Sequence, residues 1–430
     1  MQIPYNISLS VKNFLFTIKS LYNREAKLRK MALRDVFLKM ELEVSDANDE
    51  QLIWFHCNSD FEFEQALPVV EKLNEIFPEK RILVTSNDFI GRSFCCGNAA
   101  INYFFILPLD KVNNAKIFLN IWKPSVAVFV NNTFPSNYIK ELNEQHIPIV
   151  AISSTFYEKK LLLGKAGKWN RQLLGKISYF FVQNKESLNF LNSLGINNAI
   201  LSGDTLFDKS YRNKEKPKSL PLIENFIQGS IVFVFGNVAE NDKNCIVSLI
   251  NQGFNGIKFI VVGNNNDNKV LSAIESGING KVVRLSDKDH SEFPEAQVLL
   301  VDDIKLLQNI YQYASIAYVG GGFGNGVKNI SDAAAFGMPV LFGPNYNNKI
   351  EAIELVKYGG AFCVNNAEEI ISVSYKILSN YELLKKISEV SKEYVRLKKG
   401  AADKIITFLQ ALLNTSRDIV RRMQQELNMN

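Results

Sequence analysis

Short runs of β-branched and aromatic residues alternate with stretches of helical periodicity along most of this chain. This alternation is typical of parallel β-sheets whose strands are joined by crossover helices. In the first half, the predicted strands are Ile53–Cys57, Arg81–Thr85, Val126–Asn131, Ile147–Ser153, Tyr179–Gln183 and Ala199–Ser202. The predicted helices between them are Glu62–Phe77, Pro135–Gln145 and Glu186–Leu194.

A second series of strands follows the polar segment Lys214–Pro221, which holds two prolines and is the predicted linker. Its members are Ile231–Phe235, Lys258–Val262, Lys281–Leu285, Val298–Val301, Ile316–Val319 and Pro339–Phe342, with helices from Ala367 onward. The pattern predicts an α/β fold of two doubly wound, Rossmann-like domains that face each other across a cleft. The expected divisions are an N-terminal segment 1–45, domains 46–215 and 216–400, and C-terminal helices 401–430.

Composition narrows the class of protein. The 430 residues exceed what one core usually holds, and the five cysteines and three histidines are too scattered for a disulfide scaffold, a zinc site or a histidine-based triad. No metal or other cofactor is expected. Residues 1–40 carry eight Lys/Arg against two acids, so the rest of the chain is nearly neutral although the net charge is +5. A general nucleic-acid binder is therefore not expected.

The basic N-terminal segment also has an apolar stripe. Val11, Phe14, Leu15, Ile18 and Tyr22 recur at helical spacing, and Lys12 and Lys19 lie on another side. One interpretation is a basic amphipathic helix on an anionic membrane surface. The other is a first helix packed against the protein's own core. No run is long and apolar enough to predict a membrane span, and the start does not fit a signal peptide.

The glycine-rich stretch Gly320–Gly326 follows a predicted strand and precedes an alanine-rich helix that is expected to begin near Asn329. Glycines let a backbone approach a ligand closely, and a helix N-terminus favours an anion. Phosphate binding is one interpretation, and a turn needed only for packing is the other. Five glycines in seven residues favour phosphate. A similar but weaker signal is the turn Phe235–Asn237, which has the same two interpretations.

Two further clusters carry charge. Asp60, Glu62 and Glu64 open the helix after the strand Ile53–Cys57, where carboxylates commonly serve as helix caps but where a general base could also lie. The stretch Lys159–Lys176 is basic and could bind phosphates or anionic lipid, or could be a solvated face. Its cations are Lys159, Lys160, Lys165, Lys168, Arg171 and Lys176.

The order of these segments resembles the bacterial 3-deoxy-D-manno-octulosonic acid (Kdo) transferases, and the Bacteroidetes group in particular. The similar blocks are Trp54–Pro68, Phe181–Ser187, Gly203–Asp208, Val298–Gly324 and Gly343–Ala352. The resemblance implies a GT-B-like fold and a glycosyltransferase that moves Kdo from CMP-Kdo to lipid A precursor (lipid IVA). It also implies a peripheral location at the cytoplasmic face of the inner membrane.

Site residues follow from the resemblance. The family's catalytic base corresponds to Glu62. The resemblance implies CMP contacts at Gly263, Asn264, Ile304, Lys305, Leu306, Asn329, Ile330, Ser331 and Asp332. The glycine-rich stretch and the turn described above add Gly236, Asn237, Gly320, Gly321, Gly322 and Gly324 to the expected contacts. The expected acceptor and membrane side is formed by Lys159, Lys160, Lys165, Lys168 and Arg171.

Several cleft positions depart from the family pattern. They are Phe61 for glycine, Leu67 for arginine, Thr133 for an acidic residue, Leu206 for a basic one, Gly263–Asn265 for a charged turn, Lys328 for histidine and Asp332 for glutamate. These departures leave two functions open. The first is a working Kdo transferase, and the second is a divergent paralogue with another donor or acceptor, or without catalytic activity.

Overall fold

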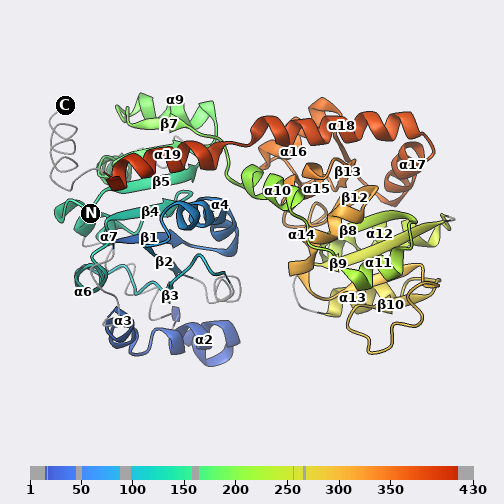
Figure 1. The fold of residues 1–430 in the computed structure, drawn as a ribbon, viewed down its shortest axis with the longest axis horizontal. Coiled ribbons are helices and arrows are strands. Elements are labelled where there is room, and N and C mark those ends of the chain that lie inside the picture. Colours follow the sequence, from blue (N-terminus) through green and yellow to red (C-terminus); the bar gives the residue numbers. More distant parts are fainter. Residues whose placement is uncertain are drawn as a thin grey trace. The chain divides into compact units, whose positions relative to one another are not determined.

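Two parallel β-sheets organise the chain in the computed structural model, which describes residues 15–16, 18–44, 51–87, 98–156, 164–254, 256–264 and 268–414. Each sheet belongs to a separate unit (Figure 1). The first unit comprises Met1–Lys209 and Gly400–Asn430, and the second comprises Ser210–Lys399. The chain passes from the first unit to the second inside helix α10 (Leu206–Glu215), and Pro221 begins the next helix.

In the described residues of the first unit, the sheet has the strand order β3-β2-β1-β4-β5-β6-β7, with every neighbouring pair parallel. Its strands are β1 (Leu52–Cys57), β2 (Arg81–Ser86), β3 (Tyr103–Ile106), β4 (Val126–Val130), β5 (Ile149–Ser154), β6 (Tyr179–Val182) and β7 (Ala199–Leu201). Its helices are α2 (Arg24–Ala32), α3 (Val36–Val44), α4 (Asp60–Ile76), α6 (Val112–Trp122), α7 (Ser136–Glu144), α8 (Gly164–Leu174), α9 (Lys185–Ser193) and α19 (Ala401–Asn414).

Both faces of this sheet are buried, which explains why its strands are continuously apolar rather than alternating. Trp54 of β1 belongs to a core that includes residues of α3, α6 and α7. Its neighbours Ile53 and Phe55 point to the opposite face, where residues of α4 and α19 cover the sheet. Helix α19, the last one within the described residues, thus packs in the first unit, against α4.

The second sheet has the order β10-β11-β9-β8-β12-β13-β14 over the residues that are described, again all parallel. Its strands are β8 (Ile231–Val238), β9 (Ile257–Gly263), β10 (Val282–Arg284), β11 (Val298–Val301), β12 (Ile316–Val319), β13 (Val340–Phe342) and β14 (Ala361–Cys363). Its helices are α11 (Pro221–Ile227), α12 (Lys243–Asn251), α13 (Asn268–Glu275), α14 (Leu307–Ile310), α15 (Ser331–Ala335), α16 (Ile350–Tyr358), α17 (Ala367–Leu378) and α18 (Tyr381–Lys398). Short 3-10 turns are η2 (Glu240–Asp242), η3 (Ile304–Leu306) and η4 (Tyr311–Tyr313).

The prediction of two doubly wound α/β domains is confirmed. In the first sheet, β1 lies between β2 and β4, and in the second sheet β8 lies between β9 and β12. The order of strands reverses direction at these two places. In open parallel sheets, ligands bind beyond the carboxyl ends of the strands at such a switch point. Ligand-binding residues are therefore expected after β1 and β4 in the first sheet, and after β8 and β12 in the second.

Candidate functional site

Glu62 lies at the switch point of the first sheet, in the first turn of α4 and directly beyond β1. Ser59 is the N-cap of this helix, and its hydroxyl accepts a hydrogen bond from the Glu62 N–H at 3.3 Å. The side chain of Glu62 is only 8% exposed. A carboxylate in this first turn is favourable for the helix, because it faces the positive end of the helix dipole.

Each carboxylate oxygen of Glu62 has its own hydrogen-bond donor. The backbone N–H of Asn58 donates to Oε2 at 2.5 Å, and the hydroxyl of Thr133 donates to Oε1 at 3.0 Å. Asn58 follows β1, and Thr133 lies in the loop that follows β4. The bond to Asn58 is a helix-capping interaction, so the capping role considered from the sequence is present. The bond to Thr133 links the two strand ends of the switch point.

The motif Gly203–Asp208 holds α4 in place from the other side. Asp204 Oδ1 accepts hydrogen bonds from Gln65 Nε2 and from the Leu206 N–H, both at 3.0 Å. The Thr205 hydroxyl donates to the carbonyl of Gln65 at 2.6 Å. Leu206, where the resemblance expects a basic residue, is buried. This motif therefore fastens the first two turns of α4 to the start of α10.

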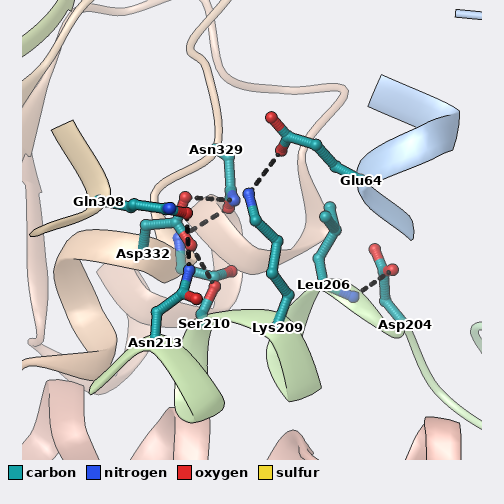
Figure 2. A network of polar contacts seen from close by, with 10 residues as sticks. Glu64, Asp204, Leu206, Lys209, Ser210, Asn213, Gln308, Asn329 and Asp332 are labelled. Carbon is teal, nitrogen blue, oxygen red and sulfur yellow. Dashed lines mark hydrogen bonds and ion pairs between the residues drawn. The ribbon is translucent and has the colours of Figure 1, made fainter. Parts of the chain in front are cut away.

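Glu64, two residues after Glu62, forms an ion pair of 2.9 Å with Lys209 of α10 (Figure 2). Both side chains are more than half buried, so this pair is better shielded from solvent than a typical surface ion pair. Glu64 thus has a structural partner of its own. Of the carboxylates that open α4, Glu62 is the one that the Thr133 hydroxyl contacts.

In the second unit, a buried carboxylate holds the glycine-rich loop. Asp242 is fully buried, and its Oδ2 accepts hydrogen bonds from the N–H groups of Ala239 and Gly321, both at 2.8 Å. Its Oδ1 accepts a hydrogen bond from the Tyr318 hydroxyl at 2.8 Å. Asp242 follows β8 and Gly321 follows β12, so this carboxylate spans the second switch point. The sequence analysis did not single out Asp242.

Close backbone packing explains two of the glycines. A Cβ atom at Gly320 would lie 2.5 Å from the carbonyl oxygen of Asn237, and one at Gly322 would lie 2.5 Å from the backbone nitrogen of Gly343. Neither approach tolerates a side chain. These contacts support the packing interpretation of the loop, and phosphate binding stays a prediction. The structure also brings Gly236 beside the loop, because the Gly320 N–H donates to the Gly236 carbonyl at 2.8 Å.

The helix expected near Asn329 begins at Ser331 and contains only five residues. Asn329 forms a turn before it: its Oδ1 accepts from the Ser331 N–H at 3.0 Å, and its Nδ2 donates to Asp332 at 3.2 Å. Asp332 also accepts a 2.6 Å hydrogen bond from the hydroxyl of Ser210 on α10 (Figure 2). Ile330 is buried between these residues. The predicted residues 329–332 are therefore already held by polar contacts within their unit.

The other predicted donor residues lie at the carboxyl ends of neighbouring strands. Gly263 ends β9, and the N–H of Asn264 donates to the Val238 carbonyl at 3.0 Å. Ile304, Lys305 and Leu306 form η3 beyond β11, where Asp303 accepts from the Lys305 N–H at 3.0 Å. Gly236 and Asn237 lie in the last part of β8, and Gly324 lies in the loop after β12.

Tyr311, whose hydroxyl lies beside Gly236, was not identified from the sequence. A Cβ atom at Gly236 would collide with its hydroxyl, so Gly236 is the residue that leaves room for this ring. The hydroxyl is buried and has no hydrogen-bond partner in the described part of the chain. Burial raises the pKa of Tyr311 far above its ordinary value, and the nearby carboxylate of Asp332 adds to this shift. No motif in the sequence marks this position.

The predicted acceptor and membrane residues are only partly described. Lys159 and Lys160 lie outside the described residues, and Lys165 lies in α8 with a side chain that is also outside them. Lys168 and Arg171 are exposed on α8. Of the N-terminal stripe, Val11 and Phe14 lie outside the described residues. Several large apolar side chains in this segment are exposed: Leu15, Ile18, Leu21, Tyr22, Met31, Leu38 and Leu42.

The end of this N-terminal segment packs on the protein itself. Val36 and Met40 of α3 are buried in the core that contains Trp54. Helix α3 thus joins the core, whereas residues before it expose apolar side chains beside Lys19 and Lys27, and their binding to a membrane stays a prediction. Across the described ranges, no helix has the length and apolar character needed to cross a membrane.

Known proteins resemble this chain in both sequence and fold. A family model described as 3-deoxy-D-manno-octulosonic-acid transferase (kdotransferase) matches residues 33–209. The chain is 25% identical over 370 residues to the 3-deoxy-D-manno-octulosonic acid transferase of Rickettsia bellii, which covers 83% of this chain and 87% of that protein. It is 24% identical over 346 residues to the enzyme of the same name from Chlamydophila psittaci, covering 76% and 78%.

Solved structures share the two-domain fold. The UDP-GlcNAc 2-epimerase from Neisseria meningitidis bound to UDP-GlcNAc aligns with a TM-score of 0.60 and 17% identity, over 84% of this chain and all of that one. A glycosyltransferase from Rickettsia africae aligns with a TM-score of 0.57 and 12% identity, over 86% of this chain and all of that one. These similarities confirm the GT-B-like architecture.

The family resemblance seen in the sequence is thus confirmed, whereas the narrower resemblance to the Bacteroidetes group stays a prediction. The matched domain contains β1, α4 and the loop after β4, which together surround Glu62. The similarity to whole relatives then continues through the second sheet. The chain is accordingly similar to the 3-deoxy-D-manno-octulosonic acid (Kdo) transferases, a family of glycosyltransferases, over most of its length.

Proposed function

We propose that this protein transfers Kdo from CMP-Kdo to lipid A precursor, at the cytoplasmic face of the inner membrane. The names of its relatives support the transferred sugar. The observation that carries the proposal is the position of Glu62, a shielded carboxylate beyond β1 at the switch point of the first sheet. That is where a parallel α/β sheet presents its functional groups.

In the proposed reaction, Glu62 acts as a general base. Its carboxylate takes the proton from an acceptor sugar hydroxyl, and the hydroxyl oxygen forms a bond with the anomeric carbon of Kdo. The bond between that carbon and the phosphate oxygen breaks, and CMP leaves with the bonding electrons. A positioned base of this kind typically contributes about 10²–10⁴-fold to the rate.

The donor is proposed to bind at the second switch point. The predicted CMP-contacting segments follow β8, β9, β11 and β12, whose carboxyl ends lie along one edge of the sheet. This edge includes the glycine-rich stretch after β12, and Lys305 on η3 provides an exposed cation next to Asp302 and Asp303 in the sequence. Amide dipoles and a cation can stabilise the negative charge that CMP carries as it leaves.

The acceptor and the membrane are proposed to meet the basic parts of the first unit. Lys168 and Arg171 are exposed on α8, and the N-terminal segment combines exposed apolar side chains with an excess of cations. Anionic lipid attracts such a surface by charge, and the apolar side chains can insert between head groups. This arrangement suits a protein that works on a phosphorylated glycolipid without spanning the bilayer.

A transfer assay on the purified protein tests the proposal. We expect CMP-Kdo and lipid IVA to give a product whose mass increases by one or more Kdo residues, together with free CMP. The assay should include vesicles of anionic lipid, because the acceptor is amphiphilic. Failure to form this product, while the protein remains folded by circular dichroism, would contradict the proposed activity.

A divergent relative with another donor or acceptor, or without activity, is the second candidate. It is favoured by the burial of Leu206, because no charge can be presented at this position. It is also favoured by the hydrogen bond from the Gly321 N–H to Asp242, because that N–H is then not available to a phosphate. Calorimetry with CMP and with other nucleotides distinguishes the two candidates. Preferential CMP binding supports the Kdo transferase, and preference for another nucleotide, or no binding, supports the divergent relative.

A further inference from the structure

The hydroxyl of Thr133 contacts the carboxylate that is proposed to be the base. It donates to Oε1 of Glu62, while the Asn58 N–H donates to Oε2. The two donors come from the ends of β4 and β1, which are neighbours in the sheet. Two donors on different oxygens fix the plane of a carboxylate, because rotation about the last side-chain bond would break both hydrogen bonds.

The loop that carries Thr133 is held firmly by the end of β5. Asn131 has a left-handed backbone conformation with φ of +59°, which asparagine tolerates better than most residues. Its N–H donates to the Ile152 carbonyl at 2.9 Å, and its carbonyl accepts from the Ser154 hydroxyl at 2.7 Å. Asn132 forms hydrogen bonds with the backbone of Thr155 in both directions. Thr133 is therefore a fixed donor rather than a loose one.

The direction of the hydrogen bond has a chemical consequence. An ionised carboxylate can only accept, so the single hydroxyl hydrogen of Thr133 is committed to Glu62. A hydrogen bond to the charged form of an acid favours that form, which is the form able to take a proton. A carboxylate oxygen has more than one acceptor site, so the hydrogen bond from Thr133 does not by itself exclude one from a substrate hydroxyl.

We propose that Thr133 is a positioning residue for Glu62: its hydroxyl holds the carboxylate in the orientation in which it takes the proton of the acceptor. This inference rests on the proposed function. It assigns a role to a neutral hydrogen-bond donor beside the carboxylate. A second carboxylate at this position would instead repel Glu62 or share a proton with it.

The test compares Thr133→Val, which keeps the shape but removes the donor, with Thr133→Ser, which keeps the hydroxyl. We expect Thr133→Val to lower kcat by about ten- to a hundredfold, as the loss of a hydrogen bond to a charged group predicts. The KM for CMP-Kdo should not change, because the donor binds elsewhere in the proposal. Thr133→Ser should recover kcat to within about threefold of the wild type, with one methyl group less to pack.

A double-mutant cycle separates positioning from a merely structural role. In the Glu62→Gln background, Thr133→Val should cause no further loss of kcat, because the carboxylate it positions is already gone. An equal loss in both backgrounds, a loss confined to KM, or a kcat unaffected by Thr133→Val would overturn the inference. So would a Thr133→Ser variant as impaired as Thr133→Val.

A second measurement does not depend on activity. All three tryptophans, Trp54, Trp122 and Trp169, lie in the first unit, so their fluorescence reports its thermal unfolding. The shifts in melting temperature caused by Glu62→Gln and Thr133→Val should be non-additive in the double variant, and additive shifts would overturn the contact itself. If the shifts are non-additive but the wild-type protein transfers no Kdo, the proposed function is overturned, and the positioning role with it.

Discussion

The carboxylate of Asp208 accepts a hydrogen bond of 2.8 Å from the backbone N–H of Gly400, which is 192 residues further along the chain. It also accepts one of 3.3 Å from the N–H of Ala402, so Asp208 caps the start of α19. Burial raises the pKa of this carboxyl, and the backbone N–H groups of Gly400, Ala402 and Ala401 oppose that shift. Asp208 thus attaches α19 to the end of the Gly203–Asp208 motif.

Replacing Asp208 with alanine should destabilise the first unit by about 1–2 kcal/mol, because a helix cap is lost. Asp403 of the same helix is the matched control: it forms an exposed ion pair with Lys72, and Asp403→Ala should cost less than about 1 kcal/mol. Urea unfolding followed by tryptophan fluorescence measures both variants. Equal destabilisation by the two substitutions would show that the helix cap stabilises the first unit no more than an exposed ion pair does.

His56 should make the stability of the first unit depend on pH. Its imidazole is fully buried on β1, its Nδ1 shares a hydrogen bond with Thr85, and burial lowers its pKa from 6.5 to about 4. The unfolded chain therefore binds a proton at a pH where the folded chain does not. The contribution of the neutral His56 to the free energy of unfolding is fully present above pH 6.5. It is lost as the pH falls toward 4, and the loss amounts to about 3 kcal/mol in total.

The measurement is the unfolding free energy of the wild type and of His56→Gln between pH 7 and pH 4.5. The variant removes the titrating group, so its stability should fall less steeply over this range. Parallel curves for the two proteins would mean that His56 is not the source of the dependence. Tryptophan fluorescence again restricts the signal to the first unit.

Two buried tyrosines of the second unit should differ in how much stability is lost when their hydroxyl groups are removed. Tyr318 donates to the buried carboxylate of Asp242, so Tyr318→Phe should cost about 1.5–3 kcal/mol. Tyr311 has a buried hydroxyl for which the described residues provide no hydrogen-bond partner, so Tyr311→Phe should be neutral or slightly stabilising. Urea unfolding followed by circular dichroism measures the free energy of unfolding of both variants. A larger decrease in Tyr311→Phe than in Tyr318→Phe would contradict a stabilising hydrogen bond between Tyr318 and Asp242.

The exposed apolar residues of the N-terminal segment should contribute to vesicle binding. Leu21 and Tyr22 are 69% and 87% exposed, and they lie beside Lys19. Replacing both with serine should weaken sedimentation with anionic vesicles several-fold, and added salt should weaken it further. Leu397→Ser on α18 is the control, because Leu397 is equally exposed but lies outside this segment. Unchanged binding in the double variant would contradict the membrane proposal.

The sequence predicted most of the fold because the strands are buried on both faces. Continuous apolar runs such as Val126–Val130 leave little ambiguity when helices lie on each side. Two strands at sheet edges, β3 and β14, were not anticipated from the sequence. The short α15 also differs from the expected helix, because Gly337, with φ of +76°, and Pro339 end the stretch soon after it begins.

The partners in the candidate site were harder to predict. Glu62 could be singled out because it opens a helix after a strand and matches a family motif. Its contact with Thr133 joins residues 71 positions apart and depends on β1 and β4 being neighbours. Asp242 and Tyr318 are likewise 76 positions apart. Such pairs follow from sheet order, which a single sequence does not reveal.

The most direct test of the proposed function is the transfer rate of Glu62→Gln, measured beside Glu75→Gln. Glu75 lies on the exposed side of the same helix, so its substitution makes the same chemical change away from the switch point. We predict that Glu62→Gln keeps CMP affinity and fold but loses about 10²–10⁴-fold in kcat, while Glu75→Gln retains wild-type turnover. Transfer of Kdo at the wild-type rate by Glu62→Gln would contradict the assignment of Glu62 as the base.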